Sequence, residues 1–478
     1  MDETLLLVER ISTAFSILHF LLWGIVLPQL MLQRKESQAT IAWFFAIVFI
    51  PVVGSLIYLA FGKDRLARRV ARQRERASNT RALLPEIVCN LDSVDQIGQA
   101  NVVKLLSEIN SYPPVQNNSI EVLTDMHANF MGQLEAIEQA SDHVHLEYYI
   151  FRPDAIGERF SRAMRAAAKR GVEVRFLFDA VGGMMMTAAF LRELEEGGVQ
   201  IARHIPMNLF TRRWIFNFRN HRKILVVDGK VAFMGGANIG EEYLGRSSIG
   251  SWFDLHLRIE GPAVIHLQRV FADDWGFASG KSLQGVRYFP APCSPGHIVT
   301  QIVPGGPDLD QAALHELFFV AISGATERVR IMTPFFVPTE PLRVALETAG
   351  RRGVDVEVVV PAINTKEFVK LAARSYYEEL LESGIQIYEY QTGFLHAKMM
   401  TIDGRFSFVG TPNFDARSLK LNFEVGAAIY DPHITAELDS IFDRTLTQSR
   451  SIHLNEWRAR SIPAKILQNF ARLFSPIL

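Results

Sequence analysis

The chain has 478 residues, of which 48% are hydrophobic, and a formal net charge of -1. This length allows two buried cores, and the near-neutral charge gives no support for a nucleic-acid binder. The two cysteines, Cys89 and Cys293, stand in no ligand-like spacing, which argues against a disulfide framework and a cysteine-based metal site. The mean hydropathy of +0.10 is unusual for a soluble enzyme, and its source is the N-terminal region.

Two apolar stretches predict a two-helix transmembrane hairpin within residues 1–62. Residues 11–32 form the first span, and residues 40–61 would make a helix of about 33 Å against a hydrocarbon core of about 30 Å. A signal peptide is the competing interpretation of the first stretch. The absence of a basic segment before it, and the second stretch close behind, favour the membrane hairpin. Pro51 and Gly54 inside the second span are tolerable in a membrane helix.

Basic residues on the flanks predict the orientation of these spans. Residues 63–118 are expected to form a basic juxtamembrane connector that contacts anionic lipid headgroups. Its basic run is Lys63, Arg65, Arg68, Arg69, Arg72, Arg74 and Arg76, against only Arg34 and Lys35 between the spans. By the positive-inside rule, the N-terminus and the catalytic region would both be cytoplasmic.

The same pattern, H-x-K-x4-D-x6-G-x2-N, occurs twice. The first copy contains His221, Lys223, Asp228 and Asn238, and the second contains His396, Lys398, Asp403 and Asn413. A random start matches roughly once in three million positions, so the duplication is no accident. A histidine in a single copy would more often be a core residue. Two copies at identical spacing favour a functional site.

The residue types within each copy suit phosphate chemistry. The period of two along a strand places the histidine and the lysine on the same face. Histidine titrates near neutral pH and serves as a nucleophile or a proton donor. Lysine and asparagine suit the non-bridging oxygens of a phosphate group. Two such histidines can divide the work, since one attacks phosphorus while the other protonates the leaving oxygen.

A wider internal repeat predicts the architecture. Residues 136–147 parallel 321–332, residues 170–174 parallel 352–356, and residues 198–201 parallel 384–387. Each repeat alternates short β-branched strands with amphipathic helices such as 156–169 and 340–351, a pattern typical of α/β sandwiches. The predicted repeats cover residues 119–297 and 298–450.

The duplicated motif resembles the HKD signature of the phospholipase D superfamily and, within it, the bacterial cardiolipin synthase family. The stretches that carry the closer resemblance are 40–43, 51–54, 147–152, 256–262, 303–307 and 414–418. The resemblance implies two pseudo-symmetric α/β sandwich repeats that face one another and bring both His-Lys-Asn sets to one cleft. The lysines and asparagines would supply the charge stabilisation that a metal could otherwise provide, so neither a metal nor a cofactor is predicted.

The resemblance also implies residue roles. His221 would be the nucleophile that forms a phosphohistidine and His396 the general acid, although the near-symmetry leaves the reverse assignment open. Asp254 and Glu424 would orient the histidines. Asp228 and Asp403 belong to the signature, but a structural role is expected for them. Gly236 departs from the pattern, because the second copy has Thr411 there, and we expect activity to survive the missing hydroxyl.

Two further segments suggest lipid contacts. Before the first motif, the first repeat carries an extra aromatic and basic segment, with Arg212, Arg213, Trp214, Phe216 and Phe218 as candidates. Binding of single-stranded nucleic acid and simple core packing are its alternatives. Residues 451–478 contain Ile466, Leu467, Phe470, Leu473 and Phe474 at helical spacing, which predicts an amphipathic interfacial helix. Docking of this helix onto the protein's own body is an equal alternative.

These implications predict a phosphatidyltransferase of the bacterial cytoplasmic (inner) membrane. It would transfer a phosphatidyl group between two phosphatidylglycerol molecules, giving cardiolipin and glycerol. The nearest alternatives are hydrolysis by a phospholipase D and a phosphatidyltransferase for another headgroup. A nuclease and a non-catalytic membrane scaffold are less favoured, and homo-oligomer formation is left open.

Overall fold

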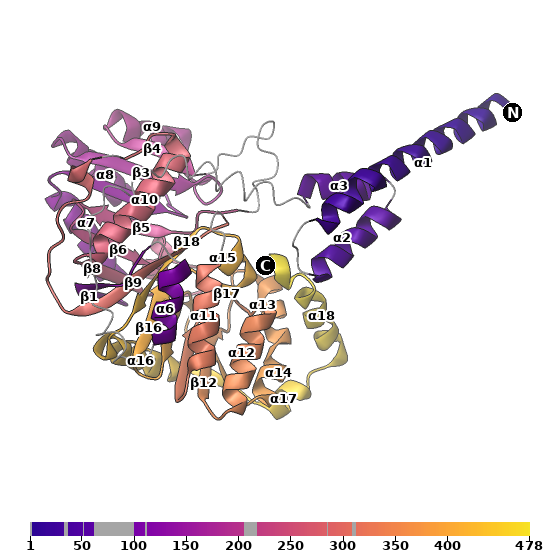
Figure 1. Cartoon of the computed structure of the whole chain (residues 1–478). Helices are drawn as coiled ribbons and strands as arrows, with labels where there is room; N and C mark the ends of the chain where they lie inside the picture. Colours follow the sequence, from indigo (N-terminus) through magenta and orange to yellow (C-terminus); the bar gives the residue numbers. More distant parts are fainter. Residues whose placement is uncertain are drawn as a thin grey trace. The chain divides into compact units, whose positions relative to one another are not determined.

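The computed structural model describes residues 2–32, 37–50, 52–61, 100–109, 112–204, 218–283, 285–307 and 312–478. The elements fall into two compact units. One contains the helices α1, α2 and α3, and the other contains every element from α6 onward (Figure 1). Each unit is an independent body of packed side chains and is described separately below.

The N-terminal unit contains one helix that is long and apolar enough to cross a membrane by length and composition. This helix, α1 (Asp2–Met31), has its apolar part at Glu9–Met31. The prediction of a single helix over residues 40–61 is wrong. That stretch forms two short helices, α2 (Ser37–Phe49) and α3 (Val53–Phe61). The break falls at Pro51 in the sequence, where a helix loses a backbone donor, and Val52 has a left-handed φ of 61°.

The helices α2 and α3 form an antiparallel hairpin. The rings of Trp43 and Tyr58 pack edge to face at 5.5 Å. Nearer the turn, a β-carbon on Gly54 would lie 1.8 Å from the carbonyl oxygen of Ala46, so only glycine allows this close approach. At the tip, the backbone N–H of Val52 donates to Nδ1 of His19 on α1 at 3.1 Å.

The second unit is built on one 15-stranded sheet whose two halves have the same strand order. In the first half the order is β1 (Val115–Leu123), β8 (His256–Glu260), β6 (Val231–Gly235), β5 (Lys223–Val227), β2 (His143–Tyr148), β3 (Glu173–Asp179) and β4 (Gln200–His204). In the second half it is β9 (Ile298–Gly305), β18 (Glu424–Ile429), β16 (Phe406–Gly410), β15 (Met399–Ile402), β10 (Arg328–Met332), β12 (Asp355–Pro361) and β13 (Gln386–Tyr390), followed by β19 (Ser449–Ile452). The two predicted α/β repeats are thereby confirmed. Antiparallel pairing of β1 with β9 joins their sheets edge to edge.

Helices cover the sheet in both halves (Figure 1). The first half carries α7 (Met126–Gln139), α8 (Ala155–Lys169), α9 (Ala188–Glu196) and α10 (Ala263–Ser279). The second carries α11 (Ala313–Gly324), α12 (Glu340–Arg351), α13 (Glu367–Ser375), α14 (Tyr377–Glu382), α15 (Ala416–Lys420) and α16 (Pro432–Leu446). The helices expected at 156–169 and 340–351 are α8 and α12.

The segments on either side of the repeats pack against the second half. Most of the predicted connector lies outside the described residues, but its end forms α6 (Ala100–Ile109), which buries Val102, Val103 and Leu106 in the same core as α11. After β19 come α17 (Leu454–Arg458) and α18 (Ile462–Arg472). The predicted C-terminal helix therefore exists, and it ends at Arg472.

Candidate active site

Two short parallel pairings between the repeats bring the duplicated motifs together. The strand β14 (Phe394–Leu395) of the second repeat pairs with β7 (Trp252–Phe253) of the first, and an isolated bridge joins Asn220 to Phe423. As a result the backbone N–H of His396 donates to the carbonyl of Phe253 at 2.7 Å, and that of His221 donates to Phe423 at 2.8 Å. Each motif is thus fastened to the other repeat.

This fastening gives each histidine a carboxylate from the opposite repeat. Nδ1 of His221 lies 2.9 Å from Oε2 of Glu424, and Nδ1 of His396 lies 2.6 Å from Oδ2 of Asp254. Both carboxylates are fully buried, whereas the His221 and His396 side chains are 12% and 9% exposed. A carboxylate on Nδ1 fixes the tautomer and leaves Nε2 for a reacting group. The structure therefore unites the four residues as two crossed pairs.

The two motif lysines are buried beside these pairs. Nζ of Lys223 donates to the carbonyl of His221 at 2.6 Å, and Nζ of Lys398 donates to that of His396. Burial lowers the pKa of Lys223 to about 7 and the pKa of Lys398 to about 8, against the opposing effect of the nearby carboxylates. Two ammonium groups this poorly hydrated form a strong site for an anion.

Burial and the ammonium groups favour the neutral form of both histidines. Burial lowers the pKa of His221 to about 4, aided by Lys223 and Lys398 and opposed by Glu424. The pKa of His396 lies well below its ordinary value for the same reason, with Lys398, Lys223 and His221 adding to the effect. Each motif shifts the pKa of the other, which identifies one shared site. A neutral imidazole is the form that attacks phosphorus.

The two carboxylates differ in their surroundings. Oε2 of Glu424 also accepts a hydrogen bond from the hydroxyl of Thr411 at 2.5 Å. At the equivalent position of the first repeat, Gly236 has no side chain, and the Asp254 carboxylate lies where one would be. Burial raises the pKa of Asp254 to about 6, against the lowering effect of Lys398. Burial acts to raise the pKa of Glu424, but the pKa is lowered overall by the hydrogen bonds from His221 and Thr411 and by the charge of Lys223.

Aromatic rings that the sequence did not single out border the histidines. The ring of Tyr149 lies 4.9 Å from His221, and that of Trp252 lies 5.3 Å from His396. The hydroxyl of Tyr243 is 3.3 Å from Nδ1 of His396. Tyr149 falls within the 147–152 stretch that carries the family resemblance, and Trp252 lies two residues before Asp254. Their positions in the sequence could therefore have identified both rings as candidates. Such rings limit the access of water to the site.

The two motif asparagines lie on the loops after β6 and β16. Oδ1 of Asn238 accepts from the backbone N–H of Ile150 at 3.1 Å, and its amide donates to Tyr243 at 3.2 Å. Asn413 is buried with no hydrogen-bond partner for Oδ1. Contacts of Asn238 and Asn413 with phosphate stay a prediction.

A buried arginine contacts the backbone on the side of the strand opposite the histidines. Arg222, between His221 and Lys223, is fully buried and forms an ion pair with Asp274 of α10. Its guanidinium donates to the carbonyl of Glu424 at 2.9 Å and to that of Gly305 at 3.0 Å. The equivalent residue in the second motif is Ala397, so this brace exists in one repeat alone. The sequence did not predict this role of Arg222. Alternation along the strand places its side chain on the face opposite His221 and Lys223, but it does not indicate which residues that side chain contacts.

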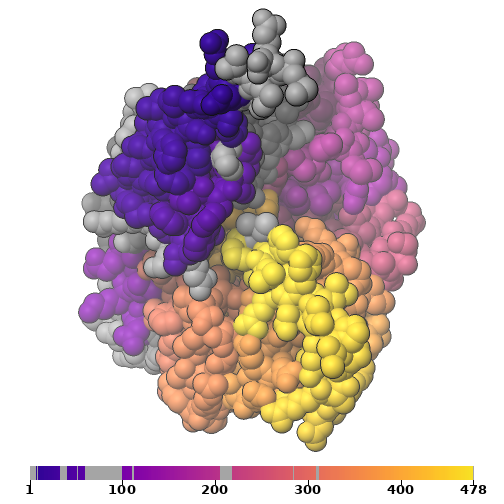
Figure 2. All heavy atoms as spheres, turned by 90° about the vertical axis from the view of Figure 1, so that its right-hand side faces the viewer, coloured from indigo at the N-terminus to yellow at the C-terminus, as the bar shows by residue number. Residues whose placement is uncertain are grey.

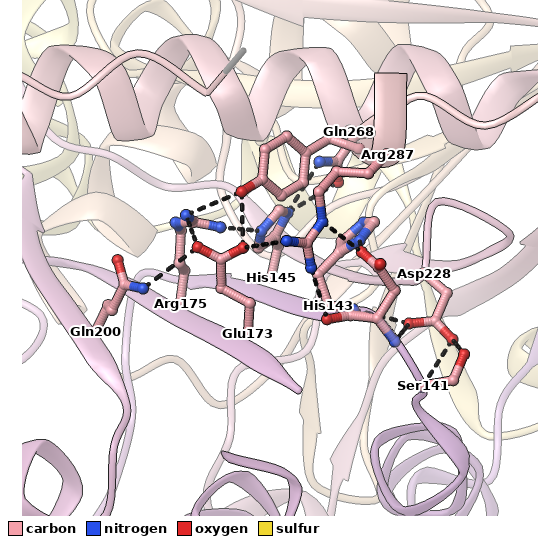
Figure 3. Close-up of polar contacts among 11 residues, drawn as sticks. Ser141, His143, His145, Glu173, Arg175, Gln200, Asp228, Gln268 and Arg287 are labelled. Atoms are coloured by element: carbon pink, nitrogen blue, oxygen red, sulfur yellow. Dashed lines mark hydrogen bonds and ion pairs between the residues drawn. The ribbon is translucent and has the colours of Figure 1, made fainter. Parts of the chain in front are cut away.

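Asp228 and Asp403 lie at the opposite ends of their strands from the histidines. Oδ1 of Asp228 accepts the backbone N–H groups of Asp142 and His143, and Oδ2 accepts from the backbone and hydroxyl of Ser141 (Figure 3). Asp403 makes the same set of contacts to residues 326–328. Both aspartates join a turn to the start of a neighbouring strand, and none of these contacts involves a histidine–carboxylate pair.

A separate polar cluster adjoins Asp228 beneath α10. Figure 3 shows His145 between Gln268 and Arg175, with Glu173 beside Arg175. Burial lowers the pKa of His145 well below its ordinary value, so this histidine is a neutral core residue. Among the described residues no group of three or more His, Cys, Asp or Glu side chains is placed to hold a metal ion.

Of the lipid-contact candidates, Arg212, Arg213, Trp214 and Phe216 lie outside the described residues. Phe218 is described and partly buried, and its carbonyl accepts a hydrogen bond from the Arg219 side chain at 3.0 Å. A role for this segment stays a prediction.

Comparison with known proteins decides the family. A family model described as "Cardiolipin synthase, PLD-like domain" matches residues 134–275 and 319–446, and one described as "Phospholipase_D-nuclease N-terminal" matches residues 17–63. The chain is 37% identical to "Cardiolipin synthase" of Geobacillus kaustophilus over 94% of this chain and 90% of the relative. The chain belongs to the cardiolipin synthase family. "Probable cardiolipin synthase YwiE" of Bacillus subtilis is 36% identical, again over 94% of this chain and 90% of the relative.

A solved structure outside the cardiolipin synthases shares the fold. The phosphatidylserine synthase of Haemophilus influenzae superimposes with a TM-score of 0.60 at 16% identity, over 79% of this chain and 100% of that chain. The predicted phospholipase D-like α/β fold is thereby confirmed. The crossed histidine pairs thus stand in the fold that cardiolipin synthases share with the wider superfamily.

Proposed function

We propose that the protein transfers a phosphatidyl group from one phosphatidylglycerol molecule to another, giving cardiolipin and glycerol. The observation that carries this proposal is the crossed arrangement, in which Nδ1 of each histidine is held by a carboxylate of the opposite repeat. Membership of the cardiolipin synthase family supports the choice of lipid.

In the first step, Nε2 of His221 attacks phosphorus and the bond from phosphorus to the glycerol oxygen breaks. His396 gives its proton to that oxygen, so that glycerol leaves as a neutral molecule. In the second step, His396 takes the proton from a hydroxyl of the second phosphatidylglycerol. The resulting oxygen attacks phosphorus, the bond from phosphorus to nitrogen breaks, and His221 is restored. The protons and charges balance over the two steps.

The lysines link substrate binding to the protonation of His396. Before substrate binds, burial and the two ammonium groups hold the pKa of His396 well below the ordinary value. A bound phosphodiester places a negative charge beside Lys223 and Lys398, which raises the pKa of His396 and lets it carry the proton it must donate. The same ammonium groups, with Asn238 and Asn413, would stabilise the added charge of the transition state.

The N-terminal unit supports a membrane location with one crossing. The apolar part of α1, Glu9–Met31, would be about 34 Å long, and His19 falls near its middle. The tip of the α2–α3 hairpin meets α1 at this histidine, through the contact from Val52. Helices of 13 and 9 residues are roughly 20 and 14 Å long, which is too short for a core of about 30 Å but close to half of it.

The hairpin is therefore proposed to enter and leave on the side where α1 ends. Its irregular turn at mid-depth is satisfied by His19, as backbone at that depth requires. The basic residues that follow α1 and those that follow α3 in the sequence then share one side, which the positive-inside rule makes cytoplasmic. The catalytic region is cytoplasmic, as the sequence predicts. The start of α1 would face the opposite side, which differs from the cytoplasmic N-terminus expected from the sequence.

Product analysis tests the proposed reaction. The purified protein in phosphatidylglycerol vesicles, with a chelator present, is expected to form cardiolipin and an equal amount of glycerol. Both products should disappear in His221→Ala and in His396→Ala. Phosphatidic acid as the main product would identify a hydrolase instead. Cardiolipin-like products formed only with another headgroup lipid would identify a different phosphatidyltransferase.

A further inference from the structure

The catalytic unit exposes large apolar side chains on two loops that occupy equivalent places in the repeats. In the first repeat, the loop after β3 exposes Met184 and Met185 by 66% and 57%. In the second, the segment after β12 exposes Ile363 and Phe368 by 43% and 38%. The strands β3 and β12 hold the same position in the two halves of the sheet. Each segment therefore follows the carboxyl end of an equivalent strand.

The loop after β3 adjoins the first histidine. A β-carbon on Gly182 would lie 1.9 Å from the carbonyl oxygen of Tyr149, so the loop and Tyr149 are in direct contact. The ring of Tyr149 in turn lies 4.9 Å from His221. Met184 and Met185 thus emerge two and three residues beyond a segment that packs against the wall of the site.

The segment after β12 adjoins the second motif. The side chain of Asn364 donates to the carbonyl of Pro334 at 3.0 Å. Two residues further on, Phe336 pairs with Phe414, which follows Asn413 of the motif. The apolar side chains of Ile363 and Phe368 therefore flank the site from the second repeat.

The C-terminal helix extends this apolar surface. Ile462, Ile466, Phe470 and Leu473 are exposed by 73%, 64%, 52% and 73% and repeat at helical spacing along one face of α18. The opposite face packs on α13 and buries Gln468 and Ala471. The ring of Phe474, just after α18, meets that of Phe368 in the first turn of α13 at 5.4 Å, so the end of α18 and the start of α13 form one surface. Figure 2 shows this C-terminal segment, in yellow, on the outside of the second repeat.

Ion pairs hold the apolar face outward. Arg472 pairs with Glu379 at 2.7 Å and Arg460 pairs with Glu378 at 2.9 Å, and both glutamates belong to α14. The helix cannot turn its apolar face inward without breaking these pairs. Among the described residues of this unit, the other exposed large apolar side chains are Val286, Phe319 and Val344, which lie on separate elements.

We propose that this apolar rim, formed by Met184, Met185, Ile363, Phe368, Ile462, Ile466, Leu467, Phe470, Leu473 and Phe474, docks onto a phospholipid bilayer. An amphipathic helix with a fixed apolar face typically sinks about 5–10 Å into the headgroup boundary. The chain contains a helix that is long and apolar enough to cross a membrane, so this surface would be tethered to a bilayer. The proposal rests on the proposed function, because docking on both sides of the histidines lets a headgroup reach them while its acyl chains stay in the membrane.

The depth of the rim in a bilayer tests this proposal without relying on activity. Single cysteines are introduced by Met184→Cys, Ile466→Cys and Phe470→Cys in the full chain, with Cys89 and Cys293 replaced by serine. The control positions are Val286→Cys and Val344→Cys, which are exposed apolar residues outside the rim. Each variant is labelled with a fluorophore and reconstituted in phosphatidylglycerol vesicles that contain lipids brominated along the acyl chain.

We expect the brominated lipids to quench the three rim labels by at least twofold and to leave the two control labels unchanged. Equal quenching at rim and control positions would overturn the proposal. Rim labels that are shielded from iodide in water but not quenched by brominated lipid would also overturn it, and would indicate a second copy of the chain on this surface. Because the readout is positional, it holds whether the vesicles yield cardiolipin, phosphatidic acid or no product.

Discussion

A β-carbon on Gly236 would lie 2.1 Å from Oδ1 of Asp254, so the carboxylate that orients His396 occupies the space of the missing side chain. In the second repeat the equivalent Thr411 keeps its side chain and donates its hydroxyl to Glu424. The repeats thus combine a shorter carboxylate with glycine, and a longer one with threonine. Glycine departs from the motif at this position because the Asp254 carboxylate needs the space that a side chain would take.

Restoring a side chain at this position should damage the site. In Gly236→Ala the Asp254 carboxylate must move, and because it is fully buried it can move only by leaving Nδ1 of His396. We expect kcat for cardiolipin formation to fall by roughly 100-fold, the scale of losing an oriented acid. Steady-state kinetics in phosphatidylglycerol vesicles measure the effect.

Gly324→Ala is the matched control, since a β-carbon there would meet nothing within 4 Å. This variant should keep the parent kcat within about twofold, as surface substitutions usually do. If Gly236→Ala behaved like Gly324→Ala, the close fit between Gly236 and Asp254 would have no catalytic meaning.

The motif aspartates should affect stability more than chemistry. In Asp228→Asn the new amide nitrogen cannot accept from the backbone or hydroxyl of Ser141, while the left-handed φ of 52° remains acceptable to asparagine. We expect a loss of about 2 kcal/mol in the free energy of unfolding and a fall in Tm of roughly 4 °C. Thermal unfolding, combined with kcat for the folded fraction, separates the two effects.

Asp403→Asn should repeat this result, because Asp403 makes the equivalent contacts in the second repeat. Asp355→Asn, at an exposed aspartate that accepts from the Gln386 side chain at 2.8 Å, should change Tm very little. A kcat for folded Asp228→Asn as low as that of a histidine variant would instead place the aspartate in the chemistry.

The sequence predicts most of this site, because the residues that the duplicated motif repeats are the residues that the site contains. Spacing alone identifies His221 and His396 as partners, and the internal repeat identifies the fold. It does not predict that each histidine takes its carboxylate from the other repeat. That crossing depends on the pairing of β7 with β14 and of Asn220 with Phe423, which are contacts between segments far apart in the chain. Composition likewise shows that residues 40–61 are apolar, but the choice between one helix and a hairpin depends on packing at Gly54.

The lysines predict the alkaline limb of the pH profile. With pKa values of about 7 and about 8, Lys223 and Lys398 lose their protons at lower pH than free lysine does. Only the charged forms hold a phosphate, so kcat/KM should fall as the pH rises through 7 to 8. The pKa of His221, about 4, places the acid limb near pH 4, where the nucleophile becomes protonated. Because His396 must also take up a proton before it can donate one, and its pKa is well below the ordinary value, kcat/KM should already decline between these limits and fall more steeply from pH 7.

The kcat profile provides the control for the pH dependence. A bound phosphate stabilises both ammonium groups, so the alkaline limb of kcat should lie at higher pH than that of kcat/KM by about one unit or more. Profiles measured in phosphatidylglycerol vesicles at constant ionic strength give both limbs. A kcat/KM that stays flat to pH 9 would show that the lysines keep their ordinary affinity for protons.

The hairpin at His19 predicts the side of the membrane on which α1 begins. If α1 crosses once and α2 and α3 turn back at mid-depth, then α1 begins on the side opposite the catalytic region. A single cysteine from Thr4→Cys should react with a membrane-impermeant maleimide added outside right-side-out vesicles. A cysteine from Val286→Cys, at a site that is 75% exposed in the catalytic unit, should react only after the vesicles are opened.

Two complete spans would protect both cysteines equally, so the labelling of Thr4→Cys distinguishes the two arrangements directly.

The hairpin should also depend on Gly54, because any side chain there meets the carbonyl of Ala46 at 1.8 Å and forces α3 away from α2. In Gly54→Leu the Val52 contact to His19 is expected to be lost, leaving buried backbone and imidazole groups without partners at a cost of several kcal/mol. Gly24→Leu is the matched substitution on α1, where a β-carbon would meet nothing within 4 Å. The amount of folded protein in the membrane should therefore fall for Gly54→Leu and remain unchanged for Gly24→Leu, and equal amounts would show that α2 and α3 do not pack as a hairpin.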